Sequence, residues 1–447
     1  MSGLEGKRPQ GSGEAAHCQR NGQAALPPIA RCARDFVTAL AEDRPYLNAA
    51  ELWVKHPHVQ AQMRLAGVEE CFVSGDGSDY EKFCNFCTVM GDIFENPLKE
   101  QVHASLRMLF DCSLSVCDAH CDAIWMAVAE ALRAEPMGAR ALVRRYGIST
   151  LLCAADPGDA LLDFLTARAA GIGVLPLFCP DALLDTASSD FPAAVRALGE
   201  AHGVSVTALD SLGAALQRAV ARFAEMGCPA AVHSVWPKVF CRPDPYHAEL
   251  ALQRALRGES LTALEQDLLQ AQLWRILGKE YRKHGLMLEL PSGGAAPMRY
   301  SKKFHTVCGG ISYQVAAELL DYLRECDGLP RIALYIADPA EATAAAALGA
   351  RYPAIGQGVP QLALGVVRGA SGRTRARLEA LAAVMPLGDA VGSFTDFRLC
   401  DDLSDAVLFH RVLCDMCAAS GGETEAARQN DIPARVAYQN FADYCML

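Results

Sequence analysis

Short apolar runs alternate with helix-like segments along most of the chain. Seven such runs, each followed by a helical pattern, lie at residues 148–156, 173–181, 228–235, 285–294, 331–339, 361–369 and 390–398. Most are apolar on both faces, which is typical of strands buried inside a parallel sheet. A weaker eighth strand is predicted at residues 28–36. Eight βα units with right-handed crossovers predict an α/β fold, a (β/α)8 TIM-like barrel.

Two helical insertions interrupt this alternation. The pattern predicts several helices after the first strand, at about residues 40–145, and a helical pair at about residues 240–284. In the second insertion, Ser260 or Thr262 is expected to cap the long helix and Gly285 to end it. Residues 1–30 are polar and predict a flexible tail. We therefore expect one domain, residues 31–447, with both insertions inside it.

The composition favours a folded cytoplasmic protein. Of the 447 residues, 51% are hydrophobic and only 21% are charged, which allows a large core. The net charge of −11 argues against nucleic-acid binding. No run of about 18 apolar residues predicts a membrane span, and the polar N-terminus does not resemble a secretory signal. The sequence leaves open whether the chain forms a homo-oligomer.

The 18 cysteines are expected to be reduced thiols. One group combines a CxxC pair with later cysteines and a histidine: Cys84, Cys87, Cys112, Cys117, His120 and Cys121. A structural zinc site would need four such ligands to converge. The later members lie in a segment with an amphipathic helical pattern, however, and buried cysteines on helix faces explain the group more simply.

Polar residues end most of the predicted strands, where barrel enzymes carry their chemistry. Asp156, Asp181 and Asp338 each neighbour a proline, which favours a role in turns or helix caps. The pair Asp396-x-Arg398 is more specific, because a spacing of two places both side chains on one face of a strand. An aspartate kept ionised by arginine can act as a base while the cation stabilises an oxyanion. The alternative is a structural ion pair at the barrel rim.

A glycine-rich turn follows the seventh predicted strand and runs from Arg368 to Arg373. Its backbone N–H groups and arginines could hold an anion at the start of the next helix. A single glycine-rich turn is weakly specific, so a solvated loop is the alternative.

Several stretches resemble the uronate isomerases, a family of the amidohydrolase superfamily. They are VSGDGSDYEKF (73–83), ENPLKEQVHASLR (95–107), ILGKEYRKHG (276–285), LPRIALYIADP (329–339) and SFTDFR (393–398). The matches follow the family's order from about residue 40 to the C-terminus. The resemblance implies an isomerase of sugar-acid catabolism, which interconverts D-glucuronate with D-fructuronate and D-galacturonate with D-tagaturonate.

The resemblance also implies roles for individual residues. Asp396 matches a metal ligand, and Asp396 and Arg398 match a pair that assists proton transfer. His58 and His233 match family histidines, so His58 is expected to help polarise substrate oxygens and His233 to bind substrate. Each of these histidines is equally well explained as a buried, hydrogen-bonded residue. The implied cofactor is one divalent metal, zinc.

Other positions depart from the family pattern. Its HxH metal-binding pair falls on Cys32-Ala33-Arg34, with His17 as an alternative for one ligand, and a family arginine falls on Cys179. Arg368 or Arg373 is expected to replace that arginine in holding the substrate carboxylate. These losses keep open a catalytically inert barrel that binds a sugar acid, a phosphate or a protein partner. A metal-dependent hydrolase is a weaker alternative, because the ligand set is thin.

Overall fold

The structure is a computed structural model that describes residues 29–94, 96–237, 240–293, 310–354, 359–394, 403–420 and 431–445. The predicted tail, residues 1–30, lies outside this part of the chain except for Ile29 and Ala30, which begin the first strand. None of the described helices is both long and apolar enough to cross a bilayer.

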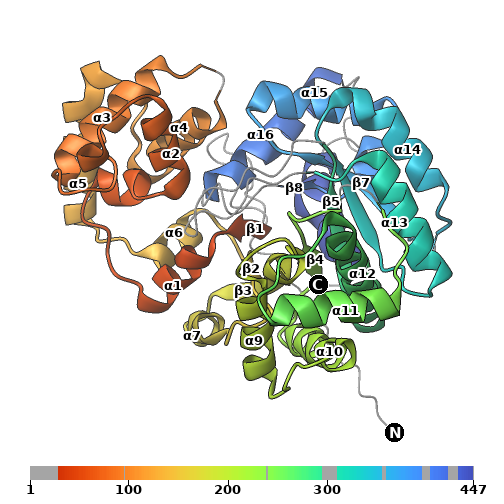
Figure 1. Cartoon of the computed structure of the whole chain (residues 1–447). Coiled ribbons are helices and arrows are strands. Elements are labelled where there is room, and N and C mark those ends of the chain that lie inside the picture. Colours follow the sequence, from red (N-terminus) through yellow and green to blue (C-terminus); the bar gives the residue numbers. More distant parts are fainter. Residues whose placement is uncertain are drawn as a thin grey trace, which may run out of the picture.

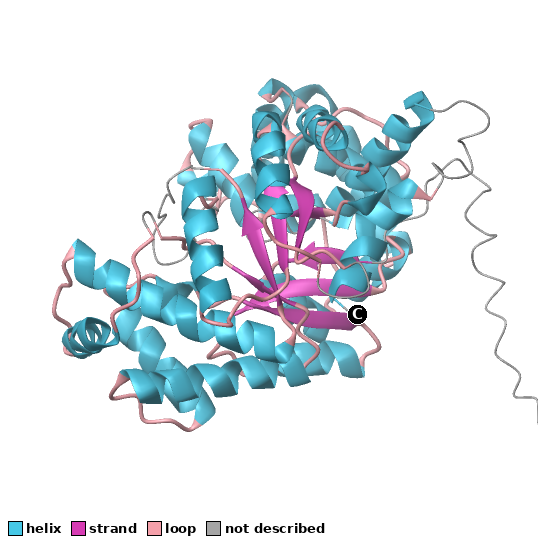
Figure 2. Cartoon of the chain, turned by 90° about the vertical axis from the view of Figure 1, so that its right-hand side faces the viewer, coloured by secondary structure: helices cyan, strands magenta, loops and turns pink. Residues whose placement is uncertain are grey.

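Eight strands form one curled parallel sheet, in which each strand pairs with the next in sequence order. They are β1 (Ile29–Cys32), β2 (Thr150–Ala155), β3 (Gly173–Phe178), β4 (Ala230–Val232), β5 (Met287–Pro291), β6 (Ile332–Ile336), β7 (Leu362–Val367) and β8 (Ser393–Phe394). Every strand lies within a predicted run, so the predicted α/β TIM-like barrel fold is confirmed. Figure 2 shows the strands at the centre with helices around them.

Helices of the βα units cover the outer face of the sheet. They are α7 (Leu162–Ala169), α8 (Asp181–Leu184), α9 (Phe191–His202), α10 (Leu209–Glu225), α13 (Tyr313–Glu325), α14 (Ala342–Ala350), α15 (Ser371–Ala382) and α16 (Leu403–Ser420). Between β4 and β5 lie α11 (Pro245–Leu256) and α12 (Ala263–His284). Thr262 and Glu265 form a capping box at the start of α12, and Gly285 ends it with a φ of 73°.

The segment between β1 and β2 is helical and packs around a core of its own. It contains α1 (Arg34–Glu42), η2 (Ala50–Val54), α2 (Pro57–Leu65), α3 (Asp79–Asp92), α4 (Pro97–Phe110), α5 (Cys121–Ala134) and α6 (Ala139–Arg145). Aromatic and aliphatic side chains of η2, α3, α4 and α5 form this second core, including Trp53, Phe83, Phe86, Leu106 and Ile124. Most of these helices project to one side of the barrel (Figure 1). We call them the helical insert.

The interior of the barrel is filled by side chains from alternate strand positions. Leu152, Leu177, Val232, Met287 and Tyr335 belong to this core. The C-terminal helix α19 (Asn440–Cys445) adds three more side chains, Phe441, Tyr444 and Cys445. The Tyr444 hydroxyl lies 2.9–3.0 Å from the carbonyl oxygens of Ile332, Pro360 and Gln361. These carbonyls lie where β6 and β7 begin, so α19 closes the N-terminal end of the barrel.

Candidate active site at the C-terminal end of the barrel

The C-terminal ends of the strands form the face that carries the predicted site. Asp396 and Arg398 follow β8, which ends at Phe394, but both lie in residues 395–402, outside the described residues. His58 belongs to α2 of the helical insert, and its side chain is also outside what the structure describes. The described part of the candidate site contains Arg368, Arg373, His233 and their neighbours.

Arg368 lies directly after β7 and joins three elements. Its backbone N–H donates to the Phe394 carbonyl of β8 at 2.8 Å, and its Nε donates to Ser393 Oγ at 2.5 Å. Nη1 donates to Asp405 Oδ2 of α16 at 2.6 Å, and the guanidinium lies 5.0 Å above the ring of Phe409. Both charged side chains are largely buried, at 13% exposure for Arg368 and 11% for Asp405. Arg368 thus fixes the position from which the segment with Asp396 continues.

The glycine-rich turn after Arg368 leads into α15, and it contacts a carboxylate of the protein itself. Ser371 donates to Glu100 Oε2 through its backbone N–H at 2.9 Å and through Oγ at 2.7 Å. Glu100 belongs to α4 of the helical insert, so the positive end of α15 receives a carboxylate there. Arg373 lies in the first turn of α15 with its side chain exposed to solvent. Arg368 and Asp405, by contrast, are largely buried.

His233 follows β4 and is completely buried. Its ring packs against Trp274 at 4.5 Å and against Trp236 at 5.4 Å, and Nε2 lies 3.3 Å from the Tyr281 hydroxyl. Trp274 and Tyr281 belong to α12 on the outside of the barrel. The side chain of His233 thus lies between the sheet and α12. The substrate-binding role expected for His233 stays a prediction.

Other polar residues at the strand ends hold the loops in place. Asp156 accepts a hydrogen bond from the Gly158 N–H at 2.8 Å, and Asp338 accepts one from the Ala340 N–H at 2.9 Å. Asp181 accepts from both the N–H and the hydroxyl of Ser234. The contacts of Asp156 and Asp338 match the turn and cap roles that neighbouring prolines favoured, whereas Asp181 joins the end of β3 to the end of β4 through Ser234, 53 residues away.

A buried ion pair crosses the barrel interior. Arg31 of β1 donates to both carboxylate oxygens of Glu289 of β5, with Nη1 2.8 Å from Oε2. The Tyr335 hydroxyl donates to Glu289 Oε1 at 3.2 Å. Burial alone would lower the pKa of Arg31, but the charge and hydrogen bonds of Glu289 outweigh burial and raise it. Burial and the same carboxylate raise the pKa of Tyr335 well above its ordinary value, so its hydroxyl remains a donor.

The pairing of Glu289 with Arg31 is not among the contacts predicted from the sequence. The alternation of β1 places Arg31 on the inner face, between the outward-facing Ala30 and Cys32. This alternation can be read from the sequence, but the partner of Arg31 lies 258 residues away. A cavity of about 30 Å3 lies beside the pair, and Arg31, Arg368, Ser393 and Phe441 contribute to its lining.

The residues at the positions of the family's HxH pair do not fit a divalent ion, and Asp396 and His17 lie outside the described residues. Cys32 packs into the outer core, and Ala33 precedes α1. Arg34 donates to Asp159 at 2.9 Å and to Asp163 at 3.0 Å. Among the described residues, three histidine, cysteine or carboxylate groups converge only in the helical insert, and none do so at the end of the barrel. A catalytic zinc would need three protein ligands there, so we derive no step through a metal.

Comparison with known proteins places these observations in a family. The model of the glucuronate isomerase family matches residues 23–445. The uronate isomerase of Shouchella clausii is 29% identical over 67% of this chain and 66% of its own. That of Caldanaerobacter subterraneus is 26% identical over 84% of both chains. The solved uronate isomerase of Thermotoga maritima superposes with a TM-score of 0.78 at 22% identity, covering 94% of each chain. At that identity, the superposition establishes the fold.

Proposed function

Because the chain belongs to the glucuronate isomerase family, we propose that it is a uronate isomerase. It would interconvert D-glucuronate with D-fructuronate and D-galacturonate with D-tagaturonate, as an intramolecular oxidoreductase of carbohydrate metabolism in the cytoplasm. The observation that carries the proposal is the family match over nearly the whole chain, which includes the Asp396-x-Arg398 pair directly after β8. Nothing in the comparisons favours the inert barrel over an isomerase.

In the proposed mechanism, Asp396 removes the C2 proton of the open-chain aldose to give an enediolate and returns this proton to C1, while the proton of the O2 hydroxyl passes to O1. Arg398, helped by His58, stabilises the oxyanion that develops at the carbonyl oxygen. These groups can supply the chemistry without a metal, because a fixed cation also stabilises developing negative charge.

Arg373 is the better placed of the two arginines proposed to hold the substrate carboxylate. It is exposed, whereas the guanidinium of Arg368 is already engaged by Asp405 and Ser393. Arg368 would then act mainly by fixing the end of β8. A role for His233 in substrate binding would require its aromatic shell to open, because the residue is completely buried.

The test follows turnover by proton NMR in deuterated water. Purified protein is incubated with D-glucuronate or D-galacturonate, with zinc and with a chelator, and both ketose formation and deuterium exchange at C2 are measured. We expect ketose from the natural chain and loss of both signals in Asp396→Asn. The matched control is Asp210→Asn, an exposed aspartate of α10, which should keep full activity. Absence of ketose and of exchange from folded natural protein would refute the proposal.

A further inference from the structure

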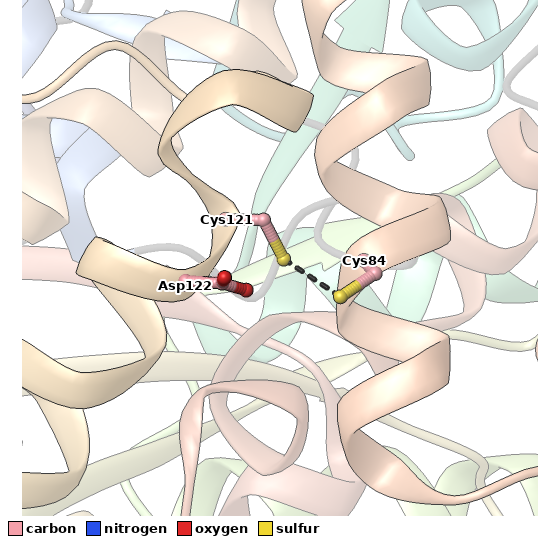
Figure 3. Close-up of side chains that lie close together, drawn as sticks. All are labelled: Cys84, Cys121 and Asp122. Carbon is pink, nitrogen blue, oxygen red and sulfur yellow. Dashed lines mark hydrogen bonds between the residues drawn. The ribbon is translucent and has the colours of Figure 1, made fainter.

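Several thiols meet a carboxylate inside the helical insert, away from the end of the barrel that carries the candidate active site. Cys84 lies in the middle of α3, and Cys121 is the first residue of α5. Their sulfur atoms are 2.8 Å apart, and the Asp122 carboxylate lies beside them (Figure 3). The nearest ligand atoms of the three residues all lie within 4.8 Å of one another.

A third thiol lies next to this group. Cys87 lies one turn after Cys84 on α3 and is fully buried, but it is not among the residues whose ligand atoms lie within 4.8 Å of one another. Burial and the neighbouring Cys121 raise the pKa of Cys87. The Tyr80 hydroxyl donates to Asp122 Oδ1, which fixes the carboxylate from outside the group. A hydrogen bond to a carboxylate commonly orients that carboxylate toward a metal ion. Two neighbouring helices thus present three sulfur atoms and one oriented oxygen.

The surroundings of these groups differ on the two sides. Phe83, Phe86 and Ile124 form the insert core on the buried side, whereas Cys84 is partly exposed and Asp122 is exposed. The group of thiols and carboxylate is therefore accessible to an ion from solvent on one side and bounded by apolar side chains on the other. Burial and the neighbouring Cys84 raise the pKa of Cys121, and the Asp122 carboxylate adds to this effect.

We propose that Cys84, Cys87, Cys121 and Asp122 form a structural site for a thiophilic divalent cation of the zinc type, which joins α3 to α5. The thiols would release their protons to solvent as the ion binds. Zinc at about 2.3 Å from sulfur and about 2.0–2.2 Å from oxygen places tetrahedral ligand atoms roughly 3.5–4 Å apart. The sulfurs of Cys84 and Cys121 would therefore separate by about 1 Å, which side-chain rotations can supply.

A disulfide between Cys84 and Cys121 explains less of the arrangement. Both residues are free thiols in the structure. A covalent bond between them would use two of the four groups and leave the Cys87 thiol and the Tyr80-oriented carboxylate without a role. The metal site uses all four groups, and it is independent of the proposed isomerase because none of its ligands is among the residues proposed for catalysis or substrate binding.

The test begins with the full chain purified under reducing conditions. Its zinc content is measured, the metal is removed with a chelator, and Co2+ is titrated while absorption is recorded. We expect about one tightly bound ion in this site, with a near-ultraviolet charge-transfer band from thiolate to cobalt. Both the ion and the band should persist in Asp396→Asn, which removes the ligand that the family resemblance implies for the barrel.

Matched variants locate the site. Cys84→Ser and Cys121→Ser should each weaken the band and the zinc affinity at least tenfold, while Cys326→Ser, an exposed cysteine of the barrel, should change neither. Because a serine variant could misfold, the melting temperature of the natural chain is also measured with and without chelator, and metal removal should lower it. No cysteine-dependent band, or a mass lower by two hydrogens with loss of two free thiols in the protein as isolated, would overturn the proposal.

Discussion

Arg31 and Glu289 depend on each other because both are removed from water. Their side chains are 9% and 0% exposed, and they face each other across the inside of the barrel. A buried charge that loses its partner pays the full cost of desolvation, whereas the intact pair contributes little net stability compared with apolar residues. The pair therefore fixes which side chains occupy the barrel interior more than it stabilises the fold.

Glu289→Gln should destabilise the protein strongly, because it leaves the Arg31 guanidinium buried without a counter-charge. We expect the free energy of unfolding to fall by about 3–5 kcal/mol, measured by urea denaturation. The control is Glu325→Gln, which removes one partner of the exposed ion pair with Arg242 and should change stability little. Equal, small effects of the two substitutions would show that the Arg31–Glu289 pair is accessible to water.

Arg373→Gln tests the proposed carboxylate contact without disturbing the core, because this side chain is exposed. We expect KM for D-glucuronate to rise about tenfold or more with kcat little changed, as for loss of a contact made equally in the ground and transition states. Arg375→Gln, two residues along α15 and paired with Glu379, serves as the control. An unchanged KM in Arg373→Gln would remove Arg373 from the substrate site.

Residues whose role is local could be predicted from the sequence, and residues whose role depends on distant partners could not. Asp338 caps a turn and Thr262 caps α12 as their neighbours suggested, because caps bind N–H groups only two or three residues away. The pairing of Arg31 with Glu289 depends on how the sheet curls. The predicted catalytic pair, Asp396 and Arg398, lies outside the described residues and stays a prediction.

At the scale of elements, α4 anchors the helical insert to the barrel. Glu100 accepts two hydrogen bonds from Ser371 at the start of α15, and the Ser404 hydroxyl of α16 donates to the Gln101 carbonyl at 3.1 Å. The sequence indicated an anion at the glycine-rich turn. It could not indicate that a carboxylate of the insert, 271 residues away, would lie there. Most strands, by contrast, were predictable because their own residues are mainly apolar.

Glu100→Ala should loosen this anchor, because the Ser371 N–H and the α15 N-terminus lose a charged acceptor. We expect a loss of about 1.5–3 kcal/mol, the range for hydrogen bonds to charged groups, and faster hydrogen exchange in the first turn of α15. Glu130→Ala, an exposed position of α5, is the matched control. Unchanged exchange at residues 371–374 would mean that the contact does not persist in solution.

At the scale of the whole molecule, the two ends of the barrel have separate tasks. The C-terminal end carries Arg368 and the segment with the predicted catalytic pair, as in other barrels of this type. The N-terminal end is closed by α19, whose Tyr444 is 5% exposed and contacts three carbonyl oxygens of β6 and the approach to β7. The helical insert has its own core, and Glu100 of this insert contacts the start of α15 at the C-terminal end of the barrel.

Substitutions of Tyr444 should separate stability from catalysis. Tyr444→Phe removes only the hydroxyl and should cost about 0.5–1.5 kcal/mol, while Tyr444→Ala also leaves a cavity and should cost about 3–5 kcal/mol. Tyr246→Ala, at an exposed tyrosine, should be close to neutral. The folded Tyr444→Phe variant should keep the kcat of the natural chain, because α19 lies at the end of the barrel opposite the site. A large fall in kcat, with the variant still folded at the assay temperature, would mean that the closed end and the candidate site are coupled.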